Sequence, residues 1–131
     1  MTLQLSASGN EAQIVIYPNN ITVDAASTVI FACAAYGNPV PDFVWMRGDG
    51  TNVTTSDPRI NITQELVEES GVTFVQSILE FCSVGVSDSS QYSCTAVASR
   101  SSATSPSFQL NVNFQPPRMY AFIYYYDYTC H

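Results

Sequence analysis

The residue types in this chain that could carry out chemistry are few and widely spaced. Its single histidine, His131, has no carboxylate or cysteine cluster around it with the spacing of metal ligands. Asp88 is followed by Ser89, but no histidine is available to complete a catalytic triad with them. No glycine-rich phosphate loop occurs. We therefore expect no enzymatic activity and no cofactor.

Three carboxylates, Glu65, Glu68 and Glu69, form a small acidic cluster before Ser70 and Gly71. Calcium-binding loops supply alternating oxygen ligands, and this cluster lacks that alternation. A solvated loop between two strands is the favoured interpretation, so no metal site is predicted.

The tripeptide Arg47-Gly48-Asp49 is one that many extracellular ligands present to integrins. Integrin binding needs an exposed hairpin tip, because the arginine must reach one pocket and the aspartate must ligate a metal ion. The stretch continues with Gly50 after an apolar strand, which is also typical of a plain hairpin turn. A glycan on the nearby Asn52 would crowd an approaching receptor. The turn interpretation is therefore favoured over an integrin partner.

Two features indicate an oxidising, extracellular compartment. The chain has an even number of cysteines, which are Cys33, Cys82, Cys94 and Cys130. It also has N-glycosylation acceptor sequences at Asn20, Asn52 and Asn61. We expect a cell-surface ectodomain or a secreted protein.

Charge and length exclude several classes of function. The net charge is −7 and the chain contains no lysine, which argues against nucleic acid, polyanions and anionic membrane surfaces as partners. No apolar stretch is long enough to cross a bilayer, so we expect no direct membrane insertion by this fragment. A length of 131 residues suits one ordinary domain rather than two.

The hydrophobic pattern predicts many short strands and almost no helix. Apolar residues alternate with polar ones, and turn-forming sequences separate the segments. The predicted strands cover residues 28–35, 42–47, 59–64, 74–81, 90–98 and 108–112. This arrangement is typical of an all-β antiparallel sandwich.

Cys33, Trp45 and Cys94, with Tyr92 two residues before the last, resemble the spacing of the immunoglobulin fold. Two longer motifs strengthen the resemblance: Gly-Asn-Pro-Val-Pro over residues 37–41, and the run from Leu79 through residues 84 and 88–94. Residues 13–112 are identified as a member of the intermediate set of immunoglobulin domains. Residues 1–12 are then an N-terminal extension, and residues 113–131 a C-terminal aromatic tail or the start of a linker. The resemblance implies an immunoglobulin-like antiparallel two-sheet Greek-key sandwich.

The resemblance also implies roles for the framework residues. In similar domains a disulfide joins the two sheets, here Cys33 to Cys94, and a tryptophan, here Trp45, is buried against it. Tyr92 forms a corner with the preceding turn.

An arginine at the start of strand D pairs with the aspartate of the E–F turn in similar domains, which implies an Arg59–Asp88 ion pair. Ala98 and Ser101 stand where asparagine and glycine are common, so the F–G hairpin is expected to be longer or differently turned.

The remaining cysteines predict a second disulfide. Cys82 faces outward at the end of strand E if Phe81 faces inward, and strands E and G run toward the same end of such a sandwich. We predict a Cys82–Cys130 bond that holds the tail, with its aromatic residues 120–128, over the outer face of that sheet. The alternative is that Cys130 pairs with a residue outside this fragment.

The fold alone does not determine the function, which depends on the surface that contacts a partner. The leading hypothesis is a recognition module of a receptor or adhesion protein that binds a protein ligand or receptor, with homophilic association as one form of it. The alternative is a structural spacer without its own ligand. A muscle-type intracellular domain is disfavoured by the three glycosylation sequences. Loops 38–42 and 99–105 are expected at one end. Asn20 on the strand A side and Asn61 on strand D would leave the C–F–G face free of sugar for binding.

Overall fold

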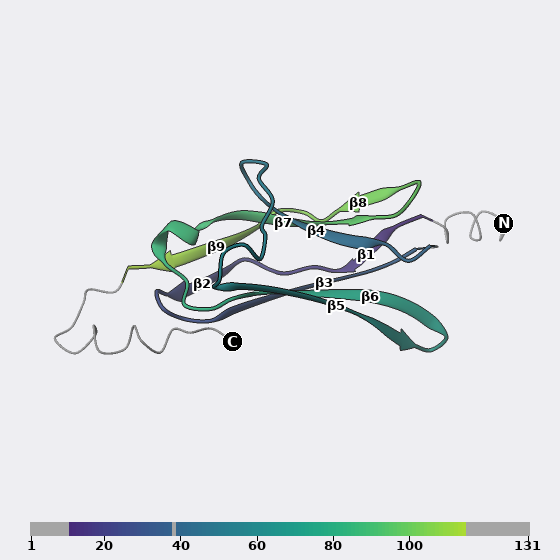
Figure 1. Cartoon of the computed structure of the whole chain (residues 1–131), viewed down its shortest axis with the longest axis horizontal. Helices are drawn as coiled ribbons and strands as arrows, with labels where there is room; N and C mark the ends of the chain where they lie inside the picture. The colour runs from purple at the N-terminus through teal and green to yellow at the C-terminus, as the bar shows by residue number, and fades with distance from the viewer. Residues whose placement is uncertain (1–10, 38, 115–131) are drawn as a thin grey trace.

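The computed structural model describes residues 11–37 and 39–114, which fold into two sheets packed face to face (Figure 1). The elements are β1 (Gln13–Ile16), β2 (Ile21–Asp24), β3 (Val29–Tyr36), β4 (Asp42–Arg47), β5 (Ile60–Glu69), β6 (Val72–Phe81), the 3-10 helix η1 (Val86–Asp88), β7 (Ser90–Val97), β8 (Ser102–Thr104) and β9 (Phe108–Asn113). One sheet has the order β1-β3-β6-β5, and the other has β2-β9-β7-β4 with β8 beside β7. The predicted all-β two-sheet sandwich is confirmed.

The first strand is divided between the two sheets. β1 pairs with β3, whereas β2 pairs with β9 in the other sheet. Pro18 lies between β1 and β2 and has no N–H to donate, so it interrupts the ladder where the chain crosses over. The β2–β9 pair is parallel, and this departs from the purely antiparallel arrangement expected from the sequence.

β5 and β6 form a hairpin that is longer than the sequence predicted, with ten residues in each strand. A tight turn at Ser70 and Gly71, both with positive φ, connects them. The acidic cluster from Glu65 to Glu69 therefore lies in β5, and the expectation of a solvated loop was wrong. β5 is an edge strand of its sheet, where carboxylates remain in water and discourage pairing with another chain.

The strand that follows β7 is broken into two pieces. β8 pairs with the end of β7, and β9 pairs with its beginning. Ser105 lies in the break, where its Oγ accepts a hydrogen bond from the Cys94 N–H at 3.1 Å. Part of the loop expected over residues 99–105 is thus the strand β8. At the break after it, the Ser105 hydroxyl takes the place of a backbone carbonyl as the acceptor for the Cys94 N–H.

The core fills the space between the two sheets. Alternate strand residues point into it, and the largest fully buried side chains include Trp45, Tyr92, Phe81, Phe108 and Leu79. The Phe108 ring lies 4.9 Å from that of Phe31 and 6.3 Å, edge-on, from that of Trp45, measured between centroids. Aromatic contacts therefore join the two sheets at the middle of the sandwich.

Candidate functional site

The framework residues lie together in the core. A disulfide joins Cys33 on β3 to Cys94 on β7, and so links the two sheets. The Trp45 side chain is 1% exposed, and its indole N–H donates to the Ser77 Oγ at 2.9 Å. Sequence reasoning missed Ser77, although the alternation along β6 places it inward, where a buried hydroxyl needs a partner.

Tyr92 closes the turn that precedes its strand. Its hydroxyl donates to the Asp88 carbonyl at 2.5 Å. Burial raises the pKa of Tyr92, and the nearby Asp88 charge adds to the rise. The hydroxyl therefore stays protonated and continues to donate at physiological pH.

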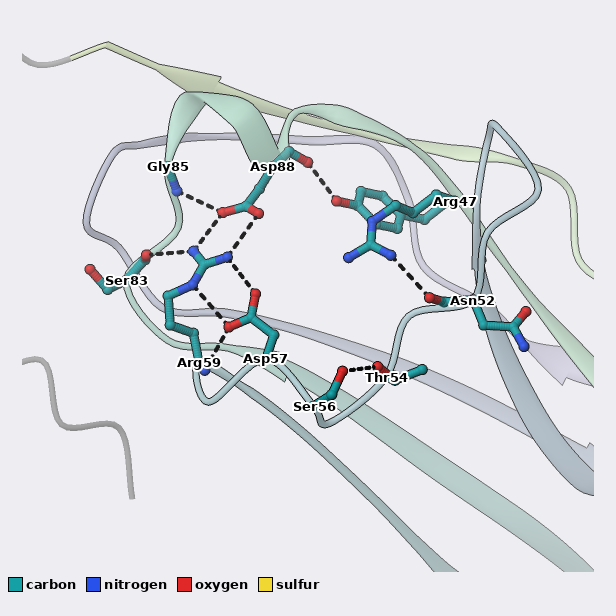
Figure 2. Close-up of polar contacts among 10 residues, drawn as sticks. Arg47, Asn52, Thr54, Ser56, Asp57, Arg59, Ser83, Gly85 and Asp88 are labelled. Atoms are coloured by element: carbon teal, nitrogen blue, oxygen red, sulfur yellow. Dashed lines mark hydrogen bonds and ion pairs between the residues drawn. The ribbon is translucent and has the colours of Figure 1, made fainter.

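Arg59 lies between two carboxylates just before β5 (Figure 2). Its Nη1 donates to Asp88 at 2.8 Å, and its Nη2 donates to Asp57 at 2.9 Å. The structure thus brings together the predicted Arg59–Asp88 pair and adds Asp57, which sequence reasoning missed although it stands two residues before Arg59. Hydrogen bonds first to Asp88 and then to Asp57 raise the pKa of Arg59. The cluster holds the start of β5 against the turn between β6 and β7.

We expect Asp57→Asn to remove an acid-dependent part of the stability. Hydrogen bonds from Arg59 lower the pKa of Asp57 below its ordinary value of 3.8. Because the folded-state pKa is depressed, the carboxylate stabilises the fold above the unfolded pKa, and this contribution is lost as the pH falls through the folded pKa. Urea unfolding followed from about pH 7 to about pH 2 should show the two proteins converging at the acid end. Glu68→Gln, which changes an exposed carboxylate, is the control. A difference between wild type and Asp57→Asn that stays constant into acid would contradict the expectation.

The Arg-Gly-Asp turn connects β4 to residue 52, and both of its charged side chains are engaged locally. The Arg47 guanidinium donates to the Asn52 carbonyl at 3.1 Å (Figure 2). The Asp49 carboxylate accepts hydrogen bonds from the Thr51 hydroxyl at 2.7 Å and the Thr51 N–H at 2.9 Å, which lower the pKa of Asp49. The turn itself closes through Gly50, whose φ is +90°.

We expect Asp49→Glu to leave cell attachment unchanged. Arg47 and Asp49 would each have to give up local hydrogen bonds to engage an integrin. Attachment of integrin-bearing cells to the immobilised protein measures the effect. Asp42→Glu, an exposed aspartate at the start of β4, is the matched control. Attachment lost in the Asp49 variant and kept in the Asp42 variant would restore the integrin interpretation.

The three glycosylation sequences lie on different parts of the surface. Asn52 is exposed in the turn after β4, and Asn61 is half-buried on β5. Asn20 is exposed just before β2, and its Oδ1 accepts a hydrogen bond from the Gln109 N–H at 2.8 Å. Asn20 was expected on the strand A side, away from the C–F–G sheet, and that placement is wrong because the chain has already crossed at Pro18. A glycan on Asn20 would sit at the edge of the sheet that contains β4, β7 and β9.

The end of β9 lies beside the chain that follows Cys82. The Asn113 carbonyl accepts a hydrogen bond from Ala25 at 3.0 Å, and Ala26 donates to the Val84 carbonyl at 2.7 Å. The Cys82 N–H donates to the Arg59 carbonyl at 2.8 Å, which continues the register of β6 with β5. Cys130 and residues 120–128 lie outside the described residues, so the second disulfide stays a prediction.

We expect proteolysis under non-reducing conditions to release a peptide that joins Cys82 to Cys130. The tail begins near Cys82 and is long enough to return to it. Mass spectrometry before and after reduction identifies the pair, with the Cys33–Cys94 peptide as the internal control. A fragment that links Cys130 to another cysteine would rule out the pairing.

A sequence profile described as "Immunoglobulin domain" matches residues 12–97, which include the disulfide and Trp45. The chain belongs to the immunoglobulin domain family. Over 96 residues, 73% of the chain, this immunoglobulin domain is 35% identical to the mouse peroxidasin homolog. Over 105 residues, 77% of the chain, it is 36% identical to mouse Roundabout homolog 1. The chain covers 6% of each of these relatives.

Solved structures agree with the assignment. The domain superposes on the N-terminal eight-domain structure of Down Syndrome Cell Adhesion Molecule with a TM-score of 0.68 and 28% identity, covering 80% of this chain and 13% of that one. On the Ig1-2 module of the Drosophila receptor protein tyrosine phosphatase DLAR the TM-score is 0.65 with 25% identity, covering 81% and 50% of the two chains. The immunoglobulin domain is homologous to cell-surface receptor and adhesion proteins.

The two outward faces of the immunoglobulin domain differ in character. The face over β7, β8 and β9 presents small or amide side chains, among them Thr95, Thr104 and Gln109. The face over β1, β3, β6 and β5 contains a hollow of about 560 Å³ whose lining includes Val15, Ile16, Tyr36, Val67, Phe74 and Glu69. We call this hollow the apolar groove. Sequence reasoning missed it, although the outward positions of β3 and β6 carry aromatic residues where a solvated strand would carry polar ones.

Residues 11–37 and 39–114 contain no helix long and apolar enough to span a membrane. In the same part of the chain, no three His, Cys, Asp or Glu side chains are grouped so that they could hold a metal ion.

Proposed function

We propose that this immunoglobulin domain is an extracellular recognition module of a cell-surface receptor or adhesion protein, and that it binds another protein. The observation that carries the proposal is the homology to cell-surface receptor and adhesion proteins such as Roundabout homolog 1 and Contactin-5. The chain spans about 6 to 7% of the length of these relatives, so a partner of its own is an inference about this domain alone.

One feature of the core and one of the surface support an extracellular location. The disulfide between Cys33 and Cys94 requires an oxidising compartment to form and persist. The acceptor residues Asn20 and Asn52 are exposed, so a transferase could reach them during secretion.

The test is binding by the secreted, glycosylated domain. We expect the chain expressed through a secretory pathway to gain glycan mass that peptide N-glycosidase removes. We also expect tetramers of it to bind cells saturably, before and after glycan removal. The Cys33→Ala/Cys94→Ala variant serves as the poorly folded control. Glycan occupancy without saturable binding to any cell type would identify a spacer, and absence of glycan would count against the extracellular location.

A further inference from the structure

The apolar groove crosses all four strands of its sheet at the end near the β5–β6 turn. Val67 on β5 stands opposite Phe74 on β6, and the Phe74 ring lies 6.1 Å from the Tyr36 ring on β3, measured between centroids. At the β1 side, Val15 is 41% exposed and Ile16 is 53% exposed. Exposed apolar side chains gathered in a hollow are typical of protein contact sites.

The charges around the groove are all negative. Glu69 lines it, and the strand alternation places Glu65 and Glu80 on the same outward face as Glu69. None of the strands β1, β3, β5 and β6 contains a lysine or an arginine. A partner that fills the groove therefore gains from basic side chains at its margins.

A second copy of this chain is a poor occupant. Docking two of these faces together would bring Glu65 and Glu69 of both copies close, and no basic residue of the four strands would balance them. The chain contains no lysine at all, and its net charge is −7. Self-association through the groove is therefore electrostatically opposed.

The C-terminal tail is also a poor occupant if Cys130 is bonded to Cys82. The chain from Phe114 to Cys130 reaches at most about 55 Å when fully extended. Phe74 stands about 27 Å along β6 from Cys82, so a loop held near Cys82 at both ends would need its whole length to reach the groove and return. Such a tail could cover the nearer part of the face, where Ile30 is 61% exposed, and would leave the groove open.

We propose that the apolar groove is the docking site for an apolar segment of another protein that carries lysine or arginine on either side. This inference rests on the proposed recognition function, and it names the surface and the chemistry of the partner. It replaces the C–F–G face, which the sequence favoured on the ground that Asn20 and Asn61 both lay elsewhere.

The first experiment uses the full, oxidised chain labelled with nitrogen-15 and a synthetic hexapeptide. The peptide has Leu-Phe-Val-Leu at its centre and a lysine at each end, and a twin peptide has glutamate ends. We expect amide shifts on titration to be confined to residues around Tyr36, Val67 and Phe74. The glutamate twin should bind about tenfold more weakly, because it brings like charge to Glu69.

Two matched pairs of variants separate the groove from its surroundings. Glu69→Lys should weaken the lysine peptide about fivefold, whereas Glu68→Lys makes the same charge change on the opposite face of β5 and should have little effect. Val67→Ser should weaken binding about tenfold, whereas its neighbour Leu66, which is 65% exposed on the other face, should tolerate the same change. Each control makes the same kind of change at the adjacent position of β5, so the difference within a pair reports which face of the strand is involved.

Several outcomes would overturn the inference. These are no binding of the lysine peptide, shifts centred on β4, β7 and β9, or equal effects of the two glutamate variants. A dimer in sedimentation that Val67→Ser abolishes would identify a second copy as the occupant. A change in the amide chemical shifts of groove residues on Cys130→Ser, without peptide, would identify the tail as the occupant.

Cell binding separates the failure of the groove from the failure of the proposed function. Cell binding that survives both Glu69→Lys and Val67→Ser would overturn the groove as the docking site and leave the proposed function standing. Wild type that binds no cells would remove the proposed function itself.

Discussion

Replacing Cys33 and Cys94 together by alanine is expected to lower the free energy of unfolding by about 4 kcal/mol. The bond joins residues 61 positions apart on opposite sheets, so its loss releases a long closed loop in the unfolded chain. For a domain of this size the melting temperature should fall by roughly 15 to 30 °C. Denaturant unfolding monitored by tryptophan fluorescence measures the change.

A second variant separates the cross-link from its packing. Cys33→Val/Cys94→Ala returns much of the lost volume to the core without a bond between the sheets. If the constraint on the unfolded chain dominates, this variant should remain nearly as unstable as the double alanine. A destabilisation below about 1 kcal/mol in both variants would show that the disulfide contributes little to the fold.

Trp45→Ala is expected to cost about 4 kcal/mol of unfolding free energy. The indole is 1% exposed, so its removal leaves a cavity in the core that the surrounding structure fills only in part. It also leaves the Ser77 hydroxyl, which is fully buried, without the 2.9 Å hydrogen bond that the indole donates. Equilibrium unfolding in urea, followed by far-ultraviolet circular dichroism because the fluorophore is lost, measures the effect.

A double-mutant cycle divides that cost between packing and the hydrogen bond. Trp45→Phe keeps a ring in the core and loses the indole N–H, and Ser77→Ala removes the acceptor. Trp45→Phe leaves the buried Ser77 hydroxyl without its donor, and Ser77→Ala leaves the buried indole N–H without its acceptor. An unpaired buried polar group costs about 1 to 3 kcal/mol, and the double variant contains neither. The double variant should therefore be more stable than the sum of the single changes implies. Strict additivity would show that the hydrogen bond contributes nothing.

The sequence motif predicted one of the two carboxylates that bind Arg59. The resemblance implied a pair with Asp88, and the two side chains lie 2.8 Å apart. Asp57 joins them because the turn before β5 folds its carboxylate back onto the guanidinium, and this depends on the local backbone path rather than on residue spacing alone.

The sequence by itself determined the sandwich, the order of its main strands and the residues of its core. Alternation of apolar residues specifies which side chains point inward, and turn-forming residues specify where strands end. The positions of Cys33, Trp45 and Cys94 then select one sandwich family, because few folds need a bond and an indole at that spacing.

Only the tertiary structure decided the surfaces. The crossover at Pro18 moves Asn20 to the other sheet, and the long β5–β6 hairpin places Val67 and Phe74 across from each other. Both features depend on which strands become neighbours and in what register, and those choices are made by contacts between residues far apart in the chain. Inward positions must be apolar because they are buried, so the sequence pattern predicts them. The shape of the outward face depends on which strands are paired and in what register, so the sequence pattern does not predict it.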